Sequence, residues 1–122
     1  MKYVLIVDDS HTIRHEIAAG LKAAGFGVSE AGDGVTGLER TTEQEFAMII
    51  LDVNMPRMGG LEMLDRLKAD PKTANIPVVL LTTEAERAMI ERARKAGAKG
   101  WLIKPVPLEH IVSTVVALTG KP

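Results

Sequence analysis

The sequence predicts a doubly wound α/β domain, in which five parallel strands alternate with five helices. Strand and helix patterns follow one another from residue 3 to residue 118 without a linker, a repeat or a low-complexity segment. The strand segments are short, apolar and rich in β-branched residues, which is typical of strands buried on both faces. Right-handed crossovers between such strands place helices on each side of the sheet.

The strands are expected at residues 3–7, 26–31, 46–51, 78–81 and 100–103. The third is the strongest, because six apolar residues run without interruption up to Leu51. Asp52 follows where that run stops, at the end of a strand that is expected to be central. A charged side chain there lies in the crevice where open α/β sheets bind ligands.

The helices are expected between the strands. Ser10 is a good cap for the first helix, and Gly25 ends it. A short second helix follows residues 33–34, and a loop rich in Asn, Pro and Gly delays the third until Leu61. The fourth helix is expected over residues 84–96, and the fifth begins after Pro107.

Length and composition limit the functional class. The chain has 122 residues, which is the size of one domain, with 46% hydrophobic and 25% charged residues and a net charge of −1. These values do not indicate disorder, nucleic-acid binding or attraction to anionic membranes. There is no Cys and no apolar segment near 20 residues long, so we expect a cytoplasmic protein without disulfides and without membrane insertion.

Polar side chains at four strand ends are expected to meet at one edge of the sheet. They are Asp8, Asp9, Asp52, Thr82 and Lys104. Three carboxylates in one crevice repel each other by roughly 4 kcal/mol per pair at about 4 Å, so cations must lie among them. Oxygen ligands with positions left for water and phosphate suit Mg²⁺ better than Zn²⁺. A carboxylate beside Mg²⁺ and an ammonium group predicts phosphoryl transfer to an aspartate.

Four motifs in this order resemble those of response-regulator receiver domains, over nearly the full length of the chain. They are Val-Leu-Ile-Val-Asp-Asp-Ser at residues 4–10, Asp-Val-Asn-Met-Pro at 52–56, Thr-Thr-Glu-Ala at 82–85 and Gly-Trp-Leu-Ile-Lys-Pro at 100–105. The resemblance is strongest to the stand-alone receivers of chemotaxis. It implies a flavodoxin-like fold with strand order 2-1-3-4-5, a single receiver domain over residues 1–122 with no output domain, and a switch that is not an enzyme.

The resemblance also implies roles for the clustered residues. Asp52 would accept a phosphoryl group from a phosphohistidine on a sensor histidine kinase. Asp8, Asp9, Asp52 and the backbone carbonyl of Asn54 would hold Mg²⁺. Lys104 would pair with the phosphoryl group, and its peptide bond to the following proline would be cis.

The same family resemblance implies a conformational switch. Thr82 would move toward the phosphate, and Trp101 would turn inward and reshape the surface made by the fourth helix, fifth strand and fifth helix. Asn54 and Glu84 would flank the water that hydrolyses the aspartyl phosphate. Three residues depart from the family pattern, since Trp101 replaces the commoner Tyr or Phe, Val106 replaces Phe and Gly59 replaces Asp.

The expected partners are a histidine kinase and a downstream protein. A flagellar motor switch component is the leading interpretation of the downstream protein, and the chain itself is expected to be a monomer. A phosphorelay intermediate, which passes its phosphoryl group to a histidine phosphotransfer protein, is the alternative. A haloacid-dehalogenase-like phosphatase would need an Asp-x-Asp signature, whereas Asp8 and Asp9 are adjacent. A flavin-binding electron carrier would need a Ser/Thr-rich phosphate loop, whereas the first loop here is acidic.

Plainer structural roles stand beside these interpretations. The first acidic pair and Ser10 could cap a helix, Asp52 and Asn54 could shape turns, and Thr82 could end a strand. Lys104 could be solvated, Trp101 could fill the core, and Glu84 could begin a helix. The histidines are expected to be surface residues outside any metal-site spacing: His11, His15 and His110. Basic residues around the fourth helix form a solvated face or a protein-binding surface.

Overall fold

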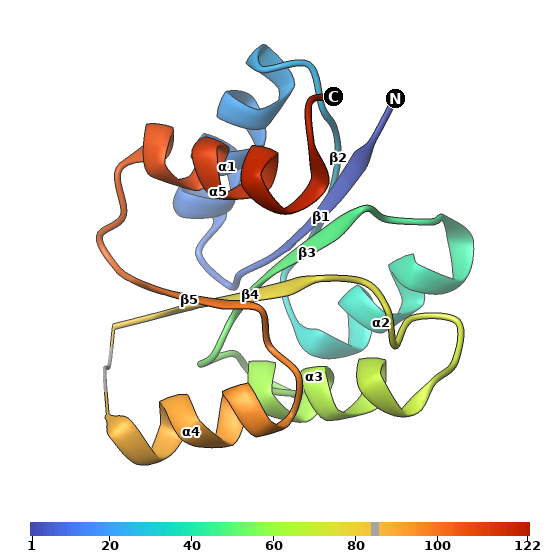
Figure 1. The fold of residues 1–122 in the computed structure, drawn as a ribbon, viewed down its shortest axis with the longest axis vertical. Coiled ribbons are helices and arrows are strands. Elements are labelled where there is room, and N and C mark those ends of the chain that lie inside the picture. Colours follow the sequence, from blue (N-terminus) through green and yellow to red (C-terminus); the bar gives the residue numbers. More distant parts are fainter. Residues whose placement is uncertain (84–85) are drawn as a thin grey trace.

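The computed structural model describes residues 1–83 and 86–122, and these residues form five strands and five helices (Figure 1). All strand pairs are parallel, in the order β2-β1-β3-β4-β5. The strands are β1 (Tyr3–Val7), β2 (Gly27–Ala31), β3 (Met48–Asp52), β4 (Val78–Thr82) and β5 (Gly100–Ile103). The helices are α1 (His11–Ala23), α2 (Gly34–Glu43), α3 (Gly60–Ala69), α4 (Arg87–Lys95) and α5 (Leu108–Thr119). The predicted doubly wound fold and strand order are confirmed.

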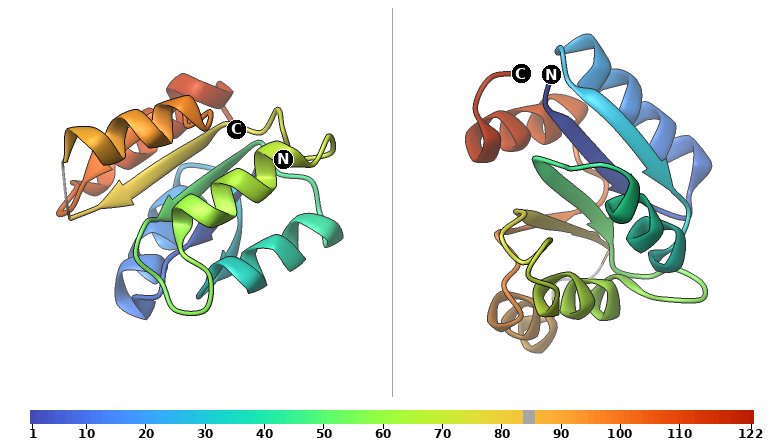
Figure 2. Two further views of the ribbon diagram at one scale, coloured as in Figure 1. Left: turned by 90° about the horizontal axis from the view of Figure 1, so that it is seen from below. Right: turned by 90° about the vertical axis from the view of Figure 1, so that its right-hand side faces the viewer.

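The sheet separates two apolar layers, with α1 and α5 on one face and α2, α3 and α4 on the other (Figures 1 and 2). Alternate side chains of a strand point to opposite faces, and β1 shows this directly. Val4 and Ile6 pack in the layer of α1 and α5, whereas Leu5 and Val7 pack in the other layer. The central strands β1, β3 and β4 are covered on both sides, which explains why their sequences are continuously apolar.

Several element boundaries differ from the prediction by one to three residues. β3 begins at Met48 and includes Asp52, because Asp52 still pairs with Leu81 of β4. The third helix begins at Gly60, one residue earlier than expected. The fourth helix begins at Arg87, since Glu86 has an extended backbone; residues 84–85 of the predicted helix lie outside the described residues.

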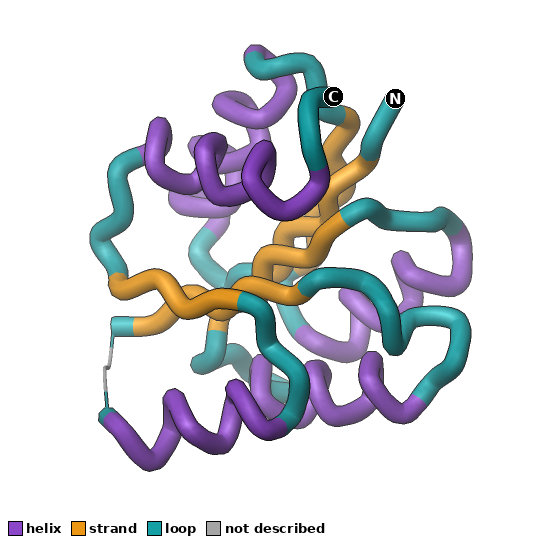
Figure 3. Tube along the Cα trace, viewed as in Figure 1, coloured by secondary structure: helices purple, strands orange, loops and turns teal. Residues whose placement is uncertain are grey.

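The two ends of the chain lie next to each other, at the edge of the sheet where the strands begin (Figure 3). The Lys2 ammonium donates to the carbonyl oxygen of Thr119 at the end of α5. Gly25, which has a φ of 101° where α1 ends, lies beside Pro122. Among the residues that the structure describes, no helix is long and apolar enough to span a membrane.

Candidate functional site

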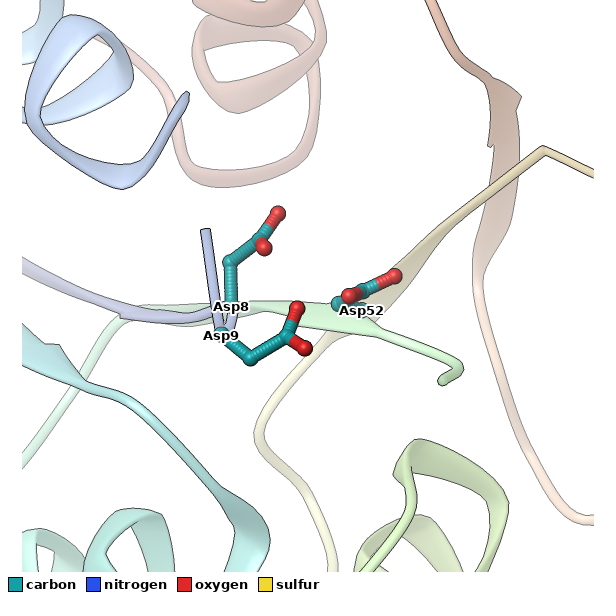
Figure 4. A group of neighbouring side chains, drawn as sticks. All are labelled: Asp8, Asp9 and Asp52. Atoms are coloured by element: carbon teal, nitrogen blue, oxygen red, sulfur yellow. The ribbon is translucent and has the colours of Figure 1, made fainter. Parts of the chain in front are cut away.

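Three carboxylates meet at the carboxyl edge of the sheet, as the sequence predicts (Figure 4). Asp8 and Asp9 follow β1, and Asp52 is the last residue of β3, the strand beside β1. One carboxylate oxygen from each residue lies within 4.8 Å of the other two. The predicted convergence of these acids is therefore confirmed.

Asp8 is completely buried and held in place by its neighbours. The main-chain N–H of Ser10 donates to Asp8 Oδ1 at 2.8 Å, and the same Ser10 caps α1 through its hydroxyl, as predicted. Arg14, in the first turns of α1, donates to the carbonyl oxygen of Asp8 at 2.7 Å. The second carboxylate oxygen, Oδ2, is also buried, and the Lys104 ammonium lies 3.0 Å from it. Helix α1 therefore fixes one oxygen of Asp8 and leaves the other for a cation.

Lys104 supplies a positive charge among these acids. Its Nζ lies 3.0 Å from Asp8 Oδ2 and 3.4 Å from Asp52 Oδ1. Its backbone N–H donates to the carbonyl oxygen of Thr82 at 2.7 Å, which extends the pairing of β4 and β5 to the site. The peptide bond between Lys104 and Pro105 is cis, as the family resemblance implies.

The electrostatics of the site keep Lys104 charged. Burial by itself lowers the pKa of an ammonium group. In Lys104 this effect is outweighed by the attraction of Asp8 and Asp52, so the pKa of Lys104 lies above its ordinary value. Lys104 is therefore protonated throughout the neutral range and acts as a fixed positive charge.

Asp52 is more basic than an ordinary aspartate. The pKa of Asp52 is raised from 3.8 to about 6, first by burial and then by the charge of Asp8, while Lys104 acts in the opposite direction. Only 5% of the residue is exposed, which accounts for the large cost of desolvating its charge. At neutral pH about nine-tenths of Asp52 is still ionised. The side chain is thus a carboxylate of raised basicity, which suits a nucleophile.

The residues of the site fit a hard divalent cation. Three carboxylates face one ammonium group, so the described cluster carries excess negative charge. The possible metal ligands are carboxylate oxygens, one from each of the three aspartates. All-oxygen donor sets of this kind suit Mg²⁺, which retains several water ligands in protein sites.

Gly60 allows the chain after β3 to turn tightly beside Asp52. A Cβ atom on Gly60 would lie 2.2 Å from the carbonyl oxygen of Asp52 and 2.9 Å from the Cα of Val53. The N–H of Gly60 donates to the carbonyl oxygen of Val53 at 2.9 Å. Only glycine permits this approach. A side chain at position 60 would therefore displace either the start of α3 or the backbone of Asp52.

Three of the four remaining predicted site residues are among the residues that the structure describes. Thr82 is buried at the end of β4, beside the strand that carries Asp52. Asn54 is exposed in the loop after β3. Trp101 is partly buried in the layer that contains α3 and α4, and its indole N–H has no acceptor among the described residues. A cavity of about 140 Å³ lies beside Trp101, between α4 and β5. Glu84 lies outside the described residues.

Sequence reasoning missed one feature next to the site. Arg14 was not singled out, although it holds the Asp8 carbonyl; its position four residues after the capping Ser10 is the signal that would have found it. The rings of His11 and His15 lie 4.1 Å apart on α1, and the one group of possible metal ligands among the described residues is the acidic cluster. The three histidines are exposed, as expected.

Comparison with known proteins decides the family. A model of the response regulator receiver domain matches residues 4–116. The chain belongs to the response regulator receiver family. As a receiver domain of two-component signalling, it is a phosphoacceptor and not a classical enzyme. The phosphatase and electron-carrier alternatives are therefore not supported.

Similar receiver proteins come from several bacteria. The chain is 36% identical to a probable chemotaxis protein CheY of Rhizobium etli over 96% of this chain and 92% of that protein. It is 38% identical to chemotaxis protein CheY-3 of Vibrio cholerae over 84% of this chain and 79% of that protein. The structure of CheY4 of Vibrio cholerae superposes with a TM-score of 0.92 at 36% identity, over 97% of this chain and 98% of the other.

A receiver domain that belongs to a histidine kinase is also similar in structure. The signal receiver domain of a signal transduction histidine kinase from Syntrophus aciditrophicus superposes with a TM-score of 0.89 at 28% identity. The match covers 98% of this chain and 90% of that one. Receiver structures of different origin thus share this arrangement of strands and helices.

Proposed function

We propose that this receiver domain takes a phosphoryl group from a phosphohistidine of a histidine kinase onto Asp52, and that the modified domain binds a downstream protein. The observation that supports this proposal is the position of Lys104, whose ammonium contacts both Asp8 and Asp52 at 3.0 and 3.4 Å inside the cluster of carboxylates. A fixed cation beside an acid of raised pKa is what phosphoryl transfer to a carboxylate requires.

The metal ligands in this proposal are the side chains of Asp8, Asp9 and Asp52 and the backbone carbonyl of Asn54. Bound Mg²⁺ would supply positive charge to the oxygen atoms of the transferring phosphoryl group. The charge balance supports this assignment, since three carboxylates within 4.8 Å of one another face a single ammonium, and their mutual repulsion is costly unless another cation accompanies them.

Asp52 acts as the nucleophile. One of its carboxylate oxygens forms the bond to phosphorus as the bond between phosphorus and the histidine nitrogen breaks, and the electron pair of that bond returns to the imidazole. Lys104 then pairs with a phosphoryl oxygen. The carboxylate must be ionised to react, so its raised pKa increases its basicity while leaving most of it active at neutral pH.

Thr82, Trp101, Asn54 and Glu84 have regulatory roles in the proposal. Thr82, buried at the end of β4, donates to the phosphoryl group. Trp101 turns inward in response and alters the surface of α4, β5 and α5, where the downstream protein binds. Asn54 and Glu84 flank the attacking water and set the lifetime of the acyl phosphate.

Chemotaxis is the proposed pathway, with a component of the flagellar motor switch as the downstream partner of a monomeric, cytoplasmic receiver. The names of the relatives from Rhizobium etli and Vibrio cholerae support this pathway. A phosphorelay intermediate is the second candidate. The likeness to a receiver domain of a histidine kinase supports it, because that receiver comes from a kinase and not from a chemotaxis protein.

Phosphorylation by acetyl phosphate tests the chemistry. With Mg²⁺, the wild type should gain one phosphoryl group by intact mass, and Asp52→Asn should gain none. Asp65→Asn, which removes an exposed carboxylate of α3, is the matched control and should be labelled like the wild type. Equal labelling of Asp52→Asn would overturn the assignment of the phosphoacceptor.

Binding and transfer assays distinguish the two pathways. Beryllofluoride-treated protein should bind a purified fragment of a flagellar motor switch protein, and untreated protein should bind it at least about tenfold more weakly. Rapid transfer of the phosphoryl group to a histidine phosphotransfer protein, without motor switch binding, would instead establish the phosphorelay role.

A further inference from the structure

Arg14 is a largely buried cation that contacts the segment carrying two of the clustered acids. Its side chain is only 15% exposed. Nε donates to Oε1 of Glu30, on β2, at 3.0 Å, and Nη1 donates to the carbonyl oxygen of Asp8 at 2.7 Å. Nη2 lies 3.2 Å from Nδ1 of His11. The guanidinium of Arg14 therefore connects α1, β2 and the residue that follows β1.

The carbonyl group that Arg14 holds belongs to the peptide bond between Asp8 and Asp9. A peptide unit is planar, so a hydrogen bond to its oxygen restricts the orientation of the whole unit. The N–H of Asp8 donates to the carbonyl oxygen of Ala31 at 3.1 Å, so the backbone of Asp8 is held on both sides. Asp9 is exposed. The direction of its carboxylate therefore depends on this backbone.

Glu30 determines where the guanidinium of Arg14 lies. A charged group that is mostly removed from water is stable only when it is paired and hydrogen-bonded, and Glu30 is paired with Arg14. The backbone of Glu30 is itself fixed, because it lies opposite Ile6 in the sheet and its carbonyl oxygen accepts from Nε of Arg40 at 3.2 Å. A chain of contacts thus runs from β2 through Arg14 to the peptide bond that joins the two acids.

We propose, on the basis that Asp8 and Asp9 bind Mg²⁺ as in the proposed function, that Arg14 and Glu30 are positioning residues for the metal site. They hold the peptide bond between the two acids in one orientation before the metal binds. Mg²⁺ demands near-ideal octahedral geometry, so acids that are free to turn away bind it more weakly. Residues that orient metal ligands in this way typically change metal affinity by about 10–100-fold.

The charge of Arg14 and its positioning role have opposite effects on Mg²⁺ binding. A nearby positive charge repels a divalent cation, so loss of the charge alone should tighten binding. Loss of the hydrogen bond to Asp8 should weaken binding. Arg14→Lys keeps the charge but lacks the planar fork of donors that reaches Glu30 and Asp8 together. The direction of the change in the two Arg14 variants therefore distinguishes positioning from charge.

Calorimetric titration of the full chain with Mg²⁺ at neutral pH tests the proposal. Arg14→Ala and Arg14→Lys should each lower the Mg²⁺ affinity by about tenfold or more, and Glu30→Gln should lower it by a smaller factor. Arg66→Ala is the matched control, because Arg66 is also a helical arginine paired with a glutamate, in this case the exposed Glu62 of α3. This control should bind Mg²⁺ like the wild type.

Labelling by acetyl phosphate gives a second readout. In Arg14→Lys the rate should be reduced at low Mg²⁺ and should approach the wild-type rate at saturating Mg²⁺, because Asp52 and Lys104 are unchanged. Equal or tighter Mg²⁺ binding in both Arg14 variants would overturn the proposal, even if they unfold more easily, because Arg14 would then only clamp α1 to β2.

The same titrations separate this proposal from the proposed phosphoryl transfer. Mg²⁺ affinities that change as expected, in a protein that acetyl phosphate does not label, would support the positioning role and refute the phosphoacceptor. A wild type that binds no Mg²⁺ would overturn both the proposed metal site and the positioning role.

Discussion

Lys104 Nζ lies 3.4 Å from Asp52 Oδ1, although β4 separates the two strands that bring these residues to the site. The same ammonium lies 3.0 Å from Asp8 Oδ2. One long, flexible side chain therefore links the end of β5 to the ends of β3 and β1. Because this contact lowers the pKa of Asp52, against the larger effects of burial and of Asp8, Lys104 influences how readily Asp52 ionises.

Replacing Lys104 with Ala should raise the pKa of Asp52 above about 6, because the only effects left are those that favour the protonated form. A carboxyl NMR titration of Asp52 measures this shift directly. At about pH 8, where Asp52 is ionised in either protein, the variant should also bind Mg²⁺ more tightly, since no ammonium competes for the acids. Lys99→Ala removes an exposed lysine and should change neither value; an unshifted Asp52 pKa in Lys104→Ala would contradict the expectation.

Replacing Asp52 with Asn should stabilise the fold at neutral pH in the absence of Mg²⁺. The folded-state pKa of Asp52, about 6, is above its ordinary value of 3.8. Asp52 therefore makes its full contribution to the free energy of unfolding below about pH 4. This contribution is lost as the pH rises through about 6, and the total loss is about 3 kcal/mol.

Urea denaturation at several pH values tests this expectation. Asp52→Asn should exceed the wild type by about 1–3 kcal/mol in unfolding free energy near pH 7.5, and the gap should close near pH 4. Glu39→Gln removes an exposed carboxylate of α2 and serves as the control for charge. A gap of constant size across the pH range would show that Asp52 titrates normally.

Replacing Gly60 with Ala should destabilise the protein by about 2–4 kcal/mol, because the new Cβ atom collides with backbone that cannot move independently of β3. The contact would be 2.2 Å from the Asp52 carbonyl oxygen. Gly59→Ala is the matched control, since its Cβ atom would lie 3.2 Å from the Val53 carbonyl oxygen, and it should cost about 1 kcal/mol or less. Equal losses in the two variants would contradict the close approach at Gly60.

Beryllofluoride with Mg²⁺ should change the emission of Trp101, the only tryptophan in the chain. The indole is partly exposed at present, and an inward turn would move it into a less polar environment. Fluorescence at fixed pH measures the change, with Asp52→Asn as the control that cannot form the acyl-phosphate mimic. An unchanged spectrum, with binding of beryllofluoride proven by calorimetry, would argue against the aromatic switch.

The fold was predictable because its signals are local and repeated. The continuous apolar runs of β1, β3 and β4 reflect strands covered on both faces, and Ser10 caps α1 as its sequence position indicates. The convergence of Asp8, Asp9 and Asp52 follows from topology alone, since parallel strands end at the same edge. The boundaries were less certain, because Asp52 continues the pairing with β4 although its side chain is charged.

The contacts made by long side chains could not be predicted in the same way. Arg14 and His15 lie beside Glu30 only because β2 and α1 are brought together in space. No pattern along the chain fixes such distances.

The tie between Lys2 and Thr119 has a practical consequence for studying this protein. Both ends of the polypeptide emerge where the strands start, while Asp52 lies where β3 finishes. A fluorophore, a surface tether or a short peptide bridge attached there would leave the acidic crevice open to a kinase. The proximity of the ends also makes the chain a good candidate for circular permutation, which would allow sensors that report phosphorylation through a break placed in an exposed loop.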